Sequence, residues 1–97
     1  MELKELVIEW ANQRDLIHEE NANKQALKLG EEVGELFSAM LKKDVYKTID
    51  ALGDIQVVLI ILAEQLGINL DECLQSAYDE IKNRQGKTIN GTFIKNN

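Results

Sequence analysis

One stretch of the chain is apolar on every side. Between Ile55 and Leu62 the sequence IQVVLIIL carries seven apolar residues, interrupted only by Gln56. On a helix, at about 100° per residue, these side chains point in all directions, and such a helix must be buried all round. A domain of 97 residues can hardly surround one helix completely. We therefore expect part of this surface to meet another subunit, in a homodimer or a homotetramer.

The composition favours an all-α fold. The chain has no proline and five aromatic residues, and helices exclude proline from their interiors and need no aromatic or β-branched runs. Hydrophobic residues make up 44% and charged residues 29% of the chain, which is typical of a soluble globular protein. The expected product is a single domain over residues 1–97, with a compact four-helix bundle-like architecture.

Apolar residues at helical spacing predict four helices. The first covers about residues 2–13, and the second about 23–43, with Asn21 or Asn23 as its N-cap. The third covers about 45–66 and is followed by Gly67 as its C-terminal cap. The fourth opens at INLDE, with Asn69 or Asp71 as cap. Its expected buried residues are Leu70, Cys73, Leu74, Ala77, Tyr78 and Ile81. Residues 85–97 show no period and are expected to be irregular.

Charge and cysteine content exclude several classes of protein. The net charge of −6 argues against binding a nucleic acid polymer, because such proteins present a basic surface. The lone Cys73 excludes an internal disulfide and favours a reducing compartment, with the thiol in the core rather than reactive. The longest apolar run, residues 57–63, is far shorter than the ~20 residues of a membrane span. We expect a cytoplasmic protein without a membrane partner.

Two groups of acids lie beside the apolar stripes of the second and third helices. They are Glu31, Glu32 and Glu35 within LGEEVGELFSAM, and Asp50 and Asp54 one turn apart on the next helix. Buried carboxylates are costly, and each raises the pKa of the next. The basic residues between positions 29 and 56 are Lys42, Lys43 and Lys47, and all three are expected to lie away from the acids.

A hard divalent cation would resolve this conflict of charge. Mg²⁺, with Mn²⁺ as the alternative, prefers carboxylate and water oxygens and commonly joins a protein to phosphate groups. Zinc fits less well, because the chain has one cysteine and one histidine, far apart, and His18 is expected to be a solvated loop residue. A di-iron site would need two Glu-x-x-His motifs. The competing interpretation is a solvated acidic surface.

The two acidic segments, taken in order, resemble a known family. KQALKLGEEVGEL followed by IDALGDIQVVLIILAEQLGI is similar to the MazG-like all-α nucleoside triphosphate pyrophosphohydrolases, which include relatives of dCTP pyrophosphatase and dimeric dUTPase. Their signature is Glu-x-x-Glu on one helix and Glu-x-x-Asp on the next, holding magnesium. The resemblance runs from about Trp10 to Lys95. It implies that Glu32, Glu35 and Asp54 are metal ligands.

The chain departs from this signature at one position. Ala51 stands where the family has its third carboxylate. Asp50, directly beside it, is the natural candidate for the missing ligand, which leaves the number of metal ions open.

The resemblance also suggests substrate contacts. KNRQGK, residues 82–87, is similar to the family segment in which lysine, asparagine and arginine contact phosphates and ribose, which implies such roles for Lys82, Asn83, Arg84 and Lys87. The competing interpretation is a solvated helix end, where basic residues complement the dipole. Trp10 is either a base-stacking residue or part of the core. Lys28 shares the sector of the acids and is a further candidate for substrate binding.

The implied reaction is hydrolysis of a nucleoside or deoxynucleoside triphosphate to the monophosphate and pyrophosphate, with Glu32 or Glu31 accepting the proton of the attacking water. Two alternatives remain open. One is a regulator that binds nucleotides without cleaving them, and the other is a helical module that binds a partner protein.

Overall fold

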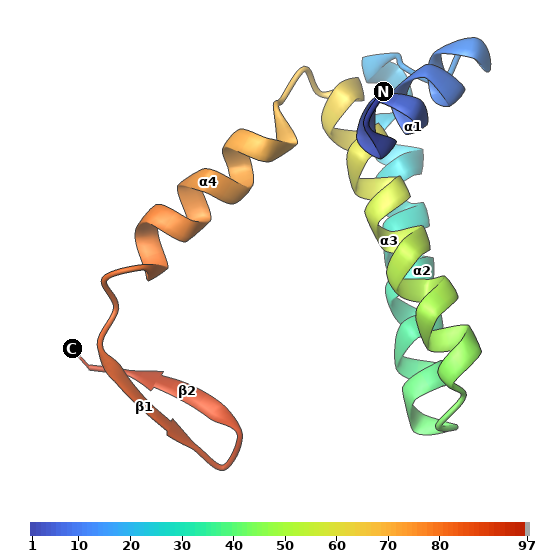
Figure 1. Ribbon diagram of the computed structural model, residues 1–97. Helices are drawn as coiled ribbons and strands as arrows, with labels where there is room; N and C mark the ends of the chain where they lie inside the picture. The colour runs from blue at the N-terminus through green and yellow to red at the C-terminus, as the bar shows by residue number, and fades with distance from the viewer. Residues whose placement is uncertain (97) are drawn as a thin grey trace.

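The computed structural model describes residues 1–96 and is mostly helical, which confirms the all-α class (Figure 1). The elements follow in the order α1 (Leu3–Gln13), a 3-10 turn η1 (Glu19–Asn21), α2 (Ala22–Leu41), α3 (Val45–Gln65), α4 (Leu70–Ile81), β1 (Gly86–Ile89) and β2 (Thr92–Lys95). The four predicted helices are all present. Their observed ends lie within two residues of the predicted ends, as expected of local sequence signals.

The antiparallel pair of α2 and α3 is the centre of the structure. Helix α1 packs against α3 at the end of the pair that lies away from the α2–α3 turn (Figure 1). The buried apolar residues are small for the most part: Ala11, Ala22, Ala39, Ala51, Val58, Ile61 and Ala63. Small side chains allow helix axes to approach closely, so the interface between α2 and α3 is tight even though it contains no large, fully buried side chain among the described residues.

The turn between α2 and α3 is fixed by backbone hydrogen bonds. The amide of Asp44 donates to the carbonyl of Ala39 (3.0 Å), and that of Lys43 donates to Met40 (3.1 Å), which together form a Schellman motif. Lys43 takes the left-handed conformation (φ 55°) that this motif requires. Asp44 then caps α3, its carboxylate accepting from the amide of Lys47 at 3.0 Å. The two helices are therefore joined in a defined register.

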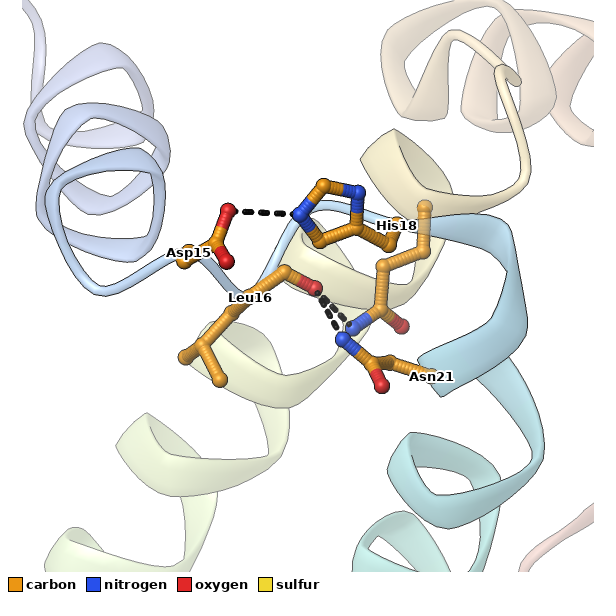
Figure 2. A network of polar contacts seen from close by, with 5 residues as sticks. Asp15, Leu16, His18 and Asn21 are labelled. Atoms are coloured by element: carbon orange, nitrogen blue, oxygen red, sulfur yellow. Dashed lines mark hydrogen bonds and ion pairs between the residues drawn. The ribbon is translucent and has the colours of Figure 1, made fainter.

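The link between α1 and α2 is held against the end of α3. Figure 2 shows the carbonyl of Leu16 as the acceptor of two side-chain amides, from Asn21 (3.2 Å) and Gln65 (2.9 Å). Asn21 occupies the N-cap position of α2, one of the two residues predicted there, but its side chain donates to Leu16 instead of capping the helix. This network ties three helices together at one point.

The four predicted helices are present, but the helix α4 leaves the rest of the molecule, so the single chain is less compact than expected. Gly67, with φ 67°, ends α3 in a second Schellman motif, and α4 runs off at a bend of 107° (Figure 1). The radius of gyration is 16.3 Å, against about 13 Å for a compact chain of 100 residues. Asn69 is the N-cap, and an ion pair between Lys4 and Asp71 holds the first turn of α4 near α1.

The predicted burial of the α4 face is wrong. Leu70 is partly buried, and the other five residues are exposed: Cys73, Leu74, Ala77, Tyr78 and Ile81. The apolar stretch of α3 behaves in the opposite way, because α1 and α2 cover most of it. Of its seven apolar residues between Ile55 and Leu62, Val57 alone is exposed.

A β-hairpin stands where the tail was expected to be irregular. Strands β1 and β2 pair antiparallel, from Gly86 opposite Lys95 to Ile89 opposite Thr92. Asn90 and Gly91 both have positive φ (51° and 80°), as a two-residue type I′ turn requires. The dipeptide Asn-Gly between strand-forming residues is a sequence signal for this turn. Asn97, the last residue of the predicted tail, lies outside the described residues.

No single helix among residues 1–96 is long and apolar enough to cross a bilayer. Helices α3 and α4 reach that length and composition only as a pair, across their 107° bend.

A pH-sensitive contact lies in the link after α1. His18 Nε2 and Asp15 Oδ1 are 2.6 Å apart (Figure 2), and this hydrogen bond raises the pKa of the imidazole. A raised pKa in the folded state means that the pair stabilises the fold below about pH 6.5, the value for unfolded histidine. That contribution is lost as the pH rises through the pKa of the folded state.

We predict that an NMR titration of His18, the one histidine of the chain, gives a pKa above that of an unfolded histidine. Asp15→Asn should bring the pKa of His18 back toward the ordinary value, because it removes the negative charge that accepts the hydrogen bond. The variant should keep the local backbone, since asparagine tolerates the left-handed conformation of position 15 (φ 57°). Glu20→Gln is the control, because Glu20 contributes least to the raised pKa. An unchanged pKa in Asp15→Asn would contradict the prediction.

Candidate metal centre

Three carboxylates from two helices meet at one point between α2 and α3. Glu32 and Glu35 of α2 and Asp54 of α3 each offer one carboxylate oxygen, and these oxygens all lie within 4.8 Å of one another. The spacing of three residues places both glutamates on one face of α2, and the antiparallel packing turns Asp54 toward that face.

Glu32 is the buried member of the three. It is 6% exposed, and its Oε2 has no hydrogen-bond partner among the described residues. Burial raises the pKa of Glu32, and the neighbouring Glu35 and Asp54 raise it further. Lys28, whose Nζ lies 3.6 Å from Oε1, offsets only part of this. A buried carboxylate oxygen without a donor is costly, and the single positive charge of Lys28 does not balance three acids, so the cluster is short of positive charge.

The donor set fits a hard divalent cation. All three groups are carboxylates, the ligands that Mg²⁺ and Mn²⁺ prefer. Neither histidine nor cysteine takes part in the cluster, which does not suit zinc. Three carboxylates also leave coordination positions for water and for a substrate's oxygens. Glu32, Glu35 and Asp54 are therefore the residues that would hold such an ion.

Asp50 and Ala51 lie beside this cluster, in a pocket of about 390 Å³. The lining residues are Glu35, Ser38, Ala39, Lys42, Lys47, Asp50, Ala51 and Asp54. Asp50 thus shares the pocket with two of the clustered acids but is not one of the three whose oxygens converge. Ala51 is 3% exposed and faces α2. A longer side chain at position 51 would enter the same pocket.

The expectation that the lysines of this region lie away from the acids is wrong for two of the three. Lys42 and Lys47 line the pocket together with Glu35, Asp50 and Asp54. The physical reason is helical periodicity: Lys42 follows Glu35 by seven residues and Lys47 precedes Asp54 by seven. Seven residues are close to two full turns, so each lysine lies on the same helix face as its acid. That spacing is the sequence signal that would have found them.

Other candidates from the sequence lie near the cluster or outside it. Glu31 is exposed and is not part of the cluster. Trp10 is 46% exposed and lines an apolar pocket of about 320 Å³ with Leu3, Leu6, Val7 and Val57. The guanidinium of Arg14 lies 4.1 Å from the centroid of its ring. Trp10 is therefore not a buried core residue in the single chain.

The basic segment after α4 is not brought to the acids within one chain. The C-terminal end of α4 and the hairpin project away from α2 and α3 (Figure 1). Lys82 pairs with Asp79 (3.1 Å) and Arg84 with Glu80 (3.3 Å), both on α4. Asn83 lies in the following link, and Lys87 is in β1.

Comparison with known proteins gives a partial match to a phage protein. An uncharacterized 18.2 kDa protein of Haemophilus phage HP1, from its rep-hol intergenic region, is 46% identical over 59 residues. The match covers 59% of this chain and 35% of the phage protein, so the chain spans about a third of that relative's length. No solved structure is significantly similar to the chain.

The family comparison covers most of the chain. Residues 2–80 match the PRA-PH family, described as phosphoribosyl-ATP pyrophosphohydrolase. The matched region runs from the start of α1 into α4, so it includes all three clustered acids and stops before the hairpin. The resemblance drawn from the sequence is confirmed at the level of the superfamily. The chain belongs to the PRA-PH family, within the superfamily of MazG-like all-α nucleoside triphosphate pyrophosphatases.

Proposed function

We propose that the protein hydrolyses a nucleoside or deoxynucleoside triphosphate to the monophosphate and pyrophosphate, with Mg²⁺ as cofactor and Mn²⁺ as a substitute. The observation that carries this proposal is the buried, unpartnered Oε2 of Glu32 beside Glu35 and Asp54. The family, whose description names a pyrophosphohydrolase, supports the reaction class.

The chain's own residues would divide the work as follows. Glu32, Glu35 and Asp54 would hold the cation, which would supply positive charge against the phosphates and make the attacking water more acidic. Glu32 or Glu31 accepts the proton of the water that attacks the α-phosphorus, and the bond to the β-phosphate oxygen breaks. The position of Glu32 within the acidic cluster favours it over Glu31, which is exposed and outside the cluster. Lys28 lies against Glu32 and would face the substrate's phosphates.

The base of the nucleotide has a candidate site in the apolar pocket at Trp10. Val57, which lines that pocket, lies one helical turn beyond Asp54 on α3. An aromatic ring exposed at such a pocket can stack on a base. We propose a cytoplasmic protein that binds neither membranes nor nucleic acid polymers, in keeping with its net charge of −6.

The first prediction of this proposal concerns the reaction. Pyrophosphate release should appear with at least one substrate in a panel of the eight common NTPs and dNTPs and phosphoribosyl-ATP, with Mg²⁺ present. Glu35→Gln and Asp54→Asn should each lose more than about 100-fold in kcat/KM, because the charge that the cation needs is removed. Glu5→Gln, on the exposed side of α1, is the matched control and should keep the wild-type rate.

The outcome separates the alternative functions. Binding of a triphosphate without cleavage would support a regulator, an interpretation favoured by Ala51 in the position of the third carboxylate. If triphosphates are neither bound nor cleaved, the remaining interpretation is a helical module that binds a partner protein. Equal losses in all three variants would mean that the acids act through general stability.

The same assay tests whether Asp50 replaces the absent family carboxylate. If it does, Asp50→Ala should lose activity about as severely as Asp54→Asn. Ala51→Glu in that background should then restore part of the rate, because position 51 opens into the same pocket. Near wild-type activity of Asp50→Ala at saturating Mg²⁺ would leave a site of three carboxylates.

A second prediction concerns stability. Glu32→Gln removes a buried charge, so the metal-free variant should melt no lower than the wild type. A gain of about 1 kcal/mol in the free energy of unfolding would raise the Tm by roughly 4 °C in a domain of this size. Millimolar Mg²⁺ should raise the Tm of the wild type by mass action and that of Glu32→Gln much less. Glu31→Gln is the control for charge alone and should respond to Mg²⁺ as the wild type does. A wild-type Tm unaffected by Mg²⁺, alone or with a non-hydrolysable triphosphate, would contradict the metal site.

We also propose that the active form is a homodimer or homotetramer. Helix α4 exposes an apolar face in the single chain, with Leu74 71% exposed and Tyr78 and Ile81 about half exposed. A second copy would cover this face. The end of α4 and the hairpin project away from α2 and α3 of the same chain. In an oligomer, this segment could instead reach the acidic cluster of another copy, with the candidate substrate-binding residues Lys82, Asn83, Arg84 and Lys87.

Light scattering at micromolar concentration should therefore give at least twice the 11.0 kDa mass of one chain. Leu74→Lys should lower that mass by placing a charge in the apolar face, whereas Ser76→Lys, on the same helix with the same added charge, should not. A wild-type monomer would defeat the proposal.

A further inference from the structure

The pocket beside the acidic cluster carries opposite charges at its two ends. Glu35 and Asp54 line it next to the cluster, Lys42 and Lys47 line it on the side of the α2–α3 turn, and Asp50 lines it between Lys47 and Asp54 on α3. We propose that Lys42 and Lys47 bind the two terminal phosphates of a nucleoside triphosphate, which become the pyrophosphate product. This inference rests on the proposed function and assigns an orientation to its substrate.

The two lysines flank the turn between α2 and α3, and both line the pocket. Each lies seven residues from an acid on its own helix, which is about 10 Å along the axis, and each is on the side of the turn. A triphosphate that meets the cluster at its α-phosphate would extend its terminal phosphates along this pocket. The apolar pocket at Val57 lies on the opposite side of Asp54, where the nucleoside would be.

Both ammonium groups are available for a ligand. Within residues 1–96 neither Lys42 nor Lys47 forms an ion pair with a carboxylate, in contrast to Lys4, Lys28 and Lys82. Their lack of partners is notable because three acids line the same pocket. The carboxylates that line the pocket repel a polyanionic ligand, and the two unpaired lysines offset part of this repulsion.

The backbone holds both lysines in place. Lys42 is the C-cap of α2, and its amide donates to the carbonyl of Ser38 at 3.1 Å. The amide of Lys47 donates to the carboxylate of Asp44 at 3.0 Å. The hydroxyl of Thr48 donates to the carbonyl of Asp44 at 2.8 Å. When the backbone of a lysine is already fixed, binding a ligand causes a smaller loss of conformational entropy. The ammonium group then donates charge-assisted hydrogen bonds to phosphate oxygens.

The floor of the pocket leaves room for phosphate groups. Ala39 of α2 and Ala51 of α3 line it, and each is 3% exposed. In the superfamily pattern a glutamate occupies position 51, so this chain has a shorter side chain where the terminal phosphates of the substrate would pass. The loss of one carboxylate also removes a negative charge from the path of the phosphates.

The test is the binding of inorganic pyrophosphate to the full chain, measured by calorimetry in the presence of Mg²⁺. Wild-type protein should bind, and Lys42→Gln and Lys47→Gln should each weaken binding about tenfold, the loss expected for one charge-assisted contact. Lys24→Gln is the matched control, since Lys24 is an exposed α2 residue with the same charge, and it should bind as the wild type does. Lys42→Arg should retain most of the affinity.

Steady-state kinetics supply a second readout. Product inhibition by pyrophosphate should weaken in Lys42→Gln and Lys47→Gln, whereas inhibition by the nucleoside monophosphate should not change. A loss of structure would affect both products alike.

The outcomes distinguish this inference from the proposed function. Hydrolysis with pyrophosphate affinity equal in wild type, Lys42→Gln and Lys47→Gln would overturn the inference and leave the proposed function standing. Lysine-dependent pyrophosphate binding without hydrolysis of any triphosphate would support the inference and count against hydrolysis. A wild-type chain that does not bind pyrophosphate would also overturn it.

Discussion

The close packing of α2 against α3 is the constraint on which the rest of the structure depends. Its buried side chains are mostly small, and Ala39 of α2 and Ala51 of α3 line the same pocket. Small residues bring the helix axes close, and this proximity places Asp54 near Glu32 and Glu35. The same packing gives little apolar burial per residue, so the hydrophobic core of the single chain is small.

The acidic cluster shows what this arrangement costs. Burial of Glu32 without a hydrogen-bond donor for Oε2 is unfavourable in the isolated chain, and neighbouring acids increase the penalty. Such unsatisfied groups are expected at sites where function, rather than folding, selects the residue. Gln65 is partly satisfied by comparison: its Nε2 donates to the carbonyl of Leu16, although its buried Oε1 also has no partner among the described residues.

Sequence reasoning succeeded where the determining forces are local. Helix ends follow from caps and from left-handed residues such as Gly67, and the three converging acids follow from spacing plus an antiparallel turn. It failed for α4, because an apolar face shows that burial is needed without showing whether the cover comes from the same chain. The hairpin was not predicted because each of its strands has only four residues, too few for a clear alternation, although the Asn90–Gly91 turn is a hairpin signal. The position of Lys42 and Lys47 at the pocket depends on helical periodicity, which brings residues seven apart onto one face.

The hairpin has a consequence for how this protein can change over time. Its strands contact each other and no other helix or strand in the described part of the chain, and it lies beyond the region shared with the PRA-PH family. Gly86 is constrained within it, since a Cβ there would collide with the backbone of Ile94. The rest of the hairpin can acquire or lose substitutions without disturbing the carboxylates of α2 and α3. Within one chain the acidic cluster and the hairpin are thus independent of each other, so the hairpin can bend or be exchanged between copies while the packing of α2 against α3 stays as it is.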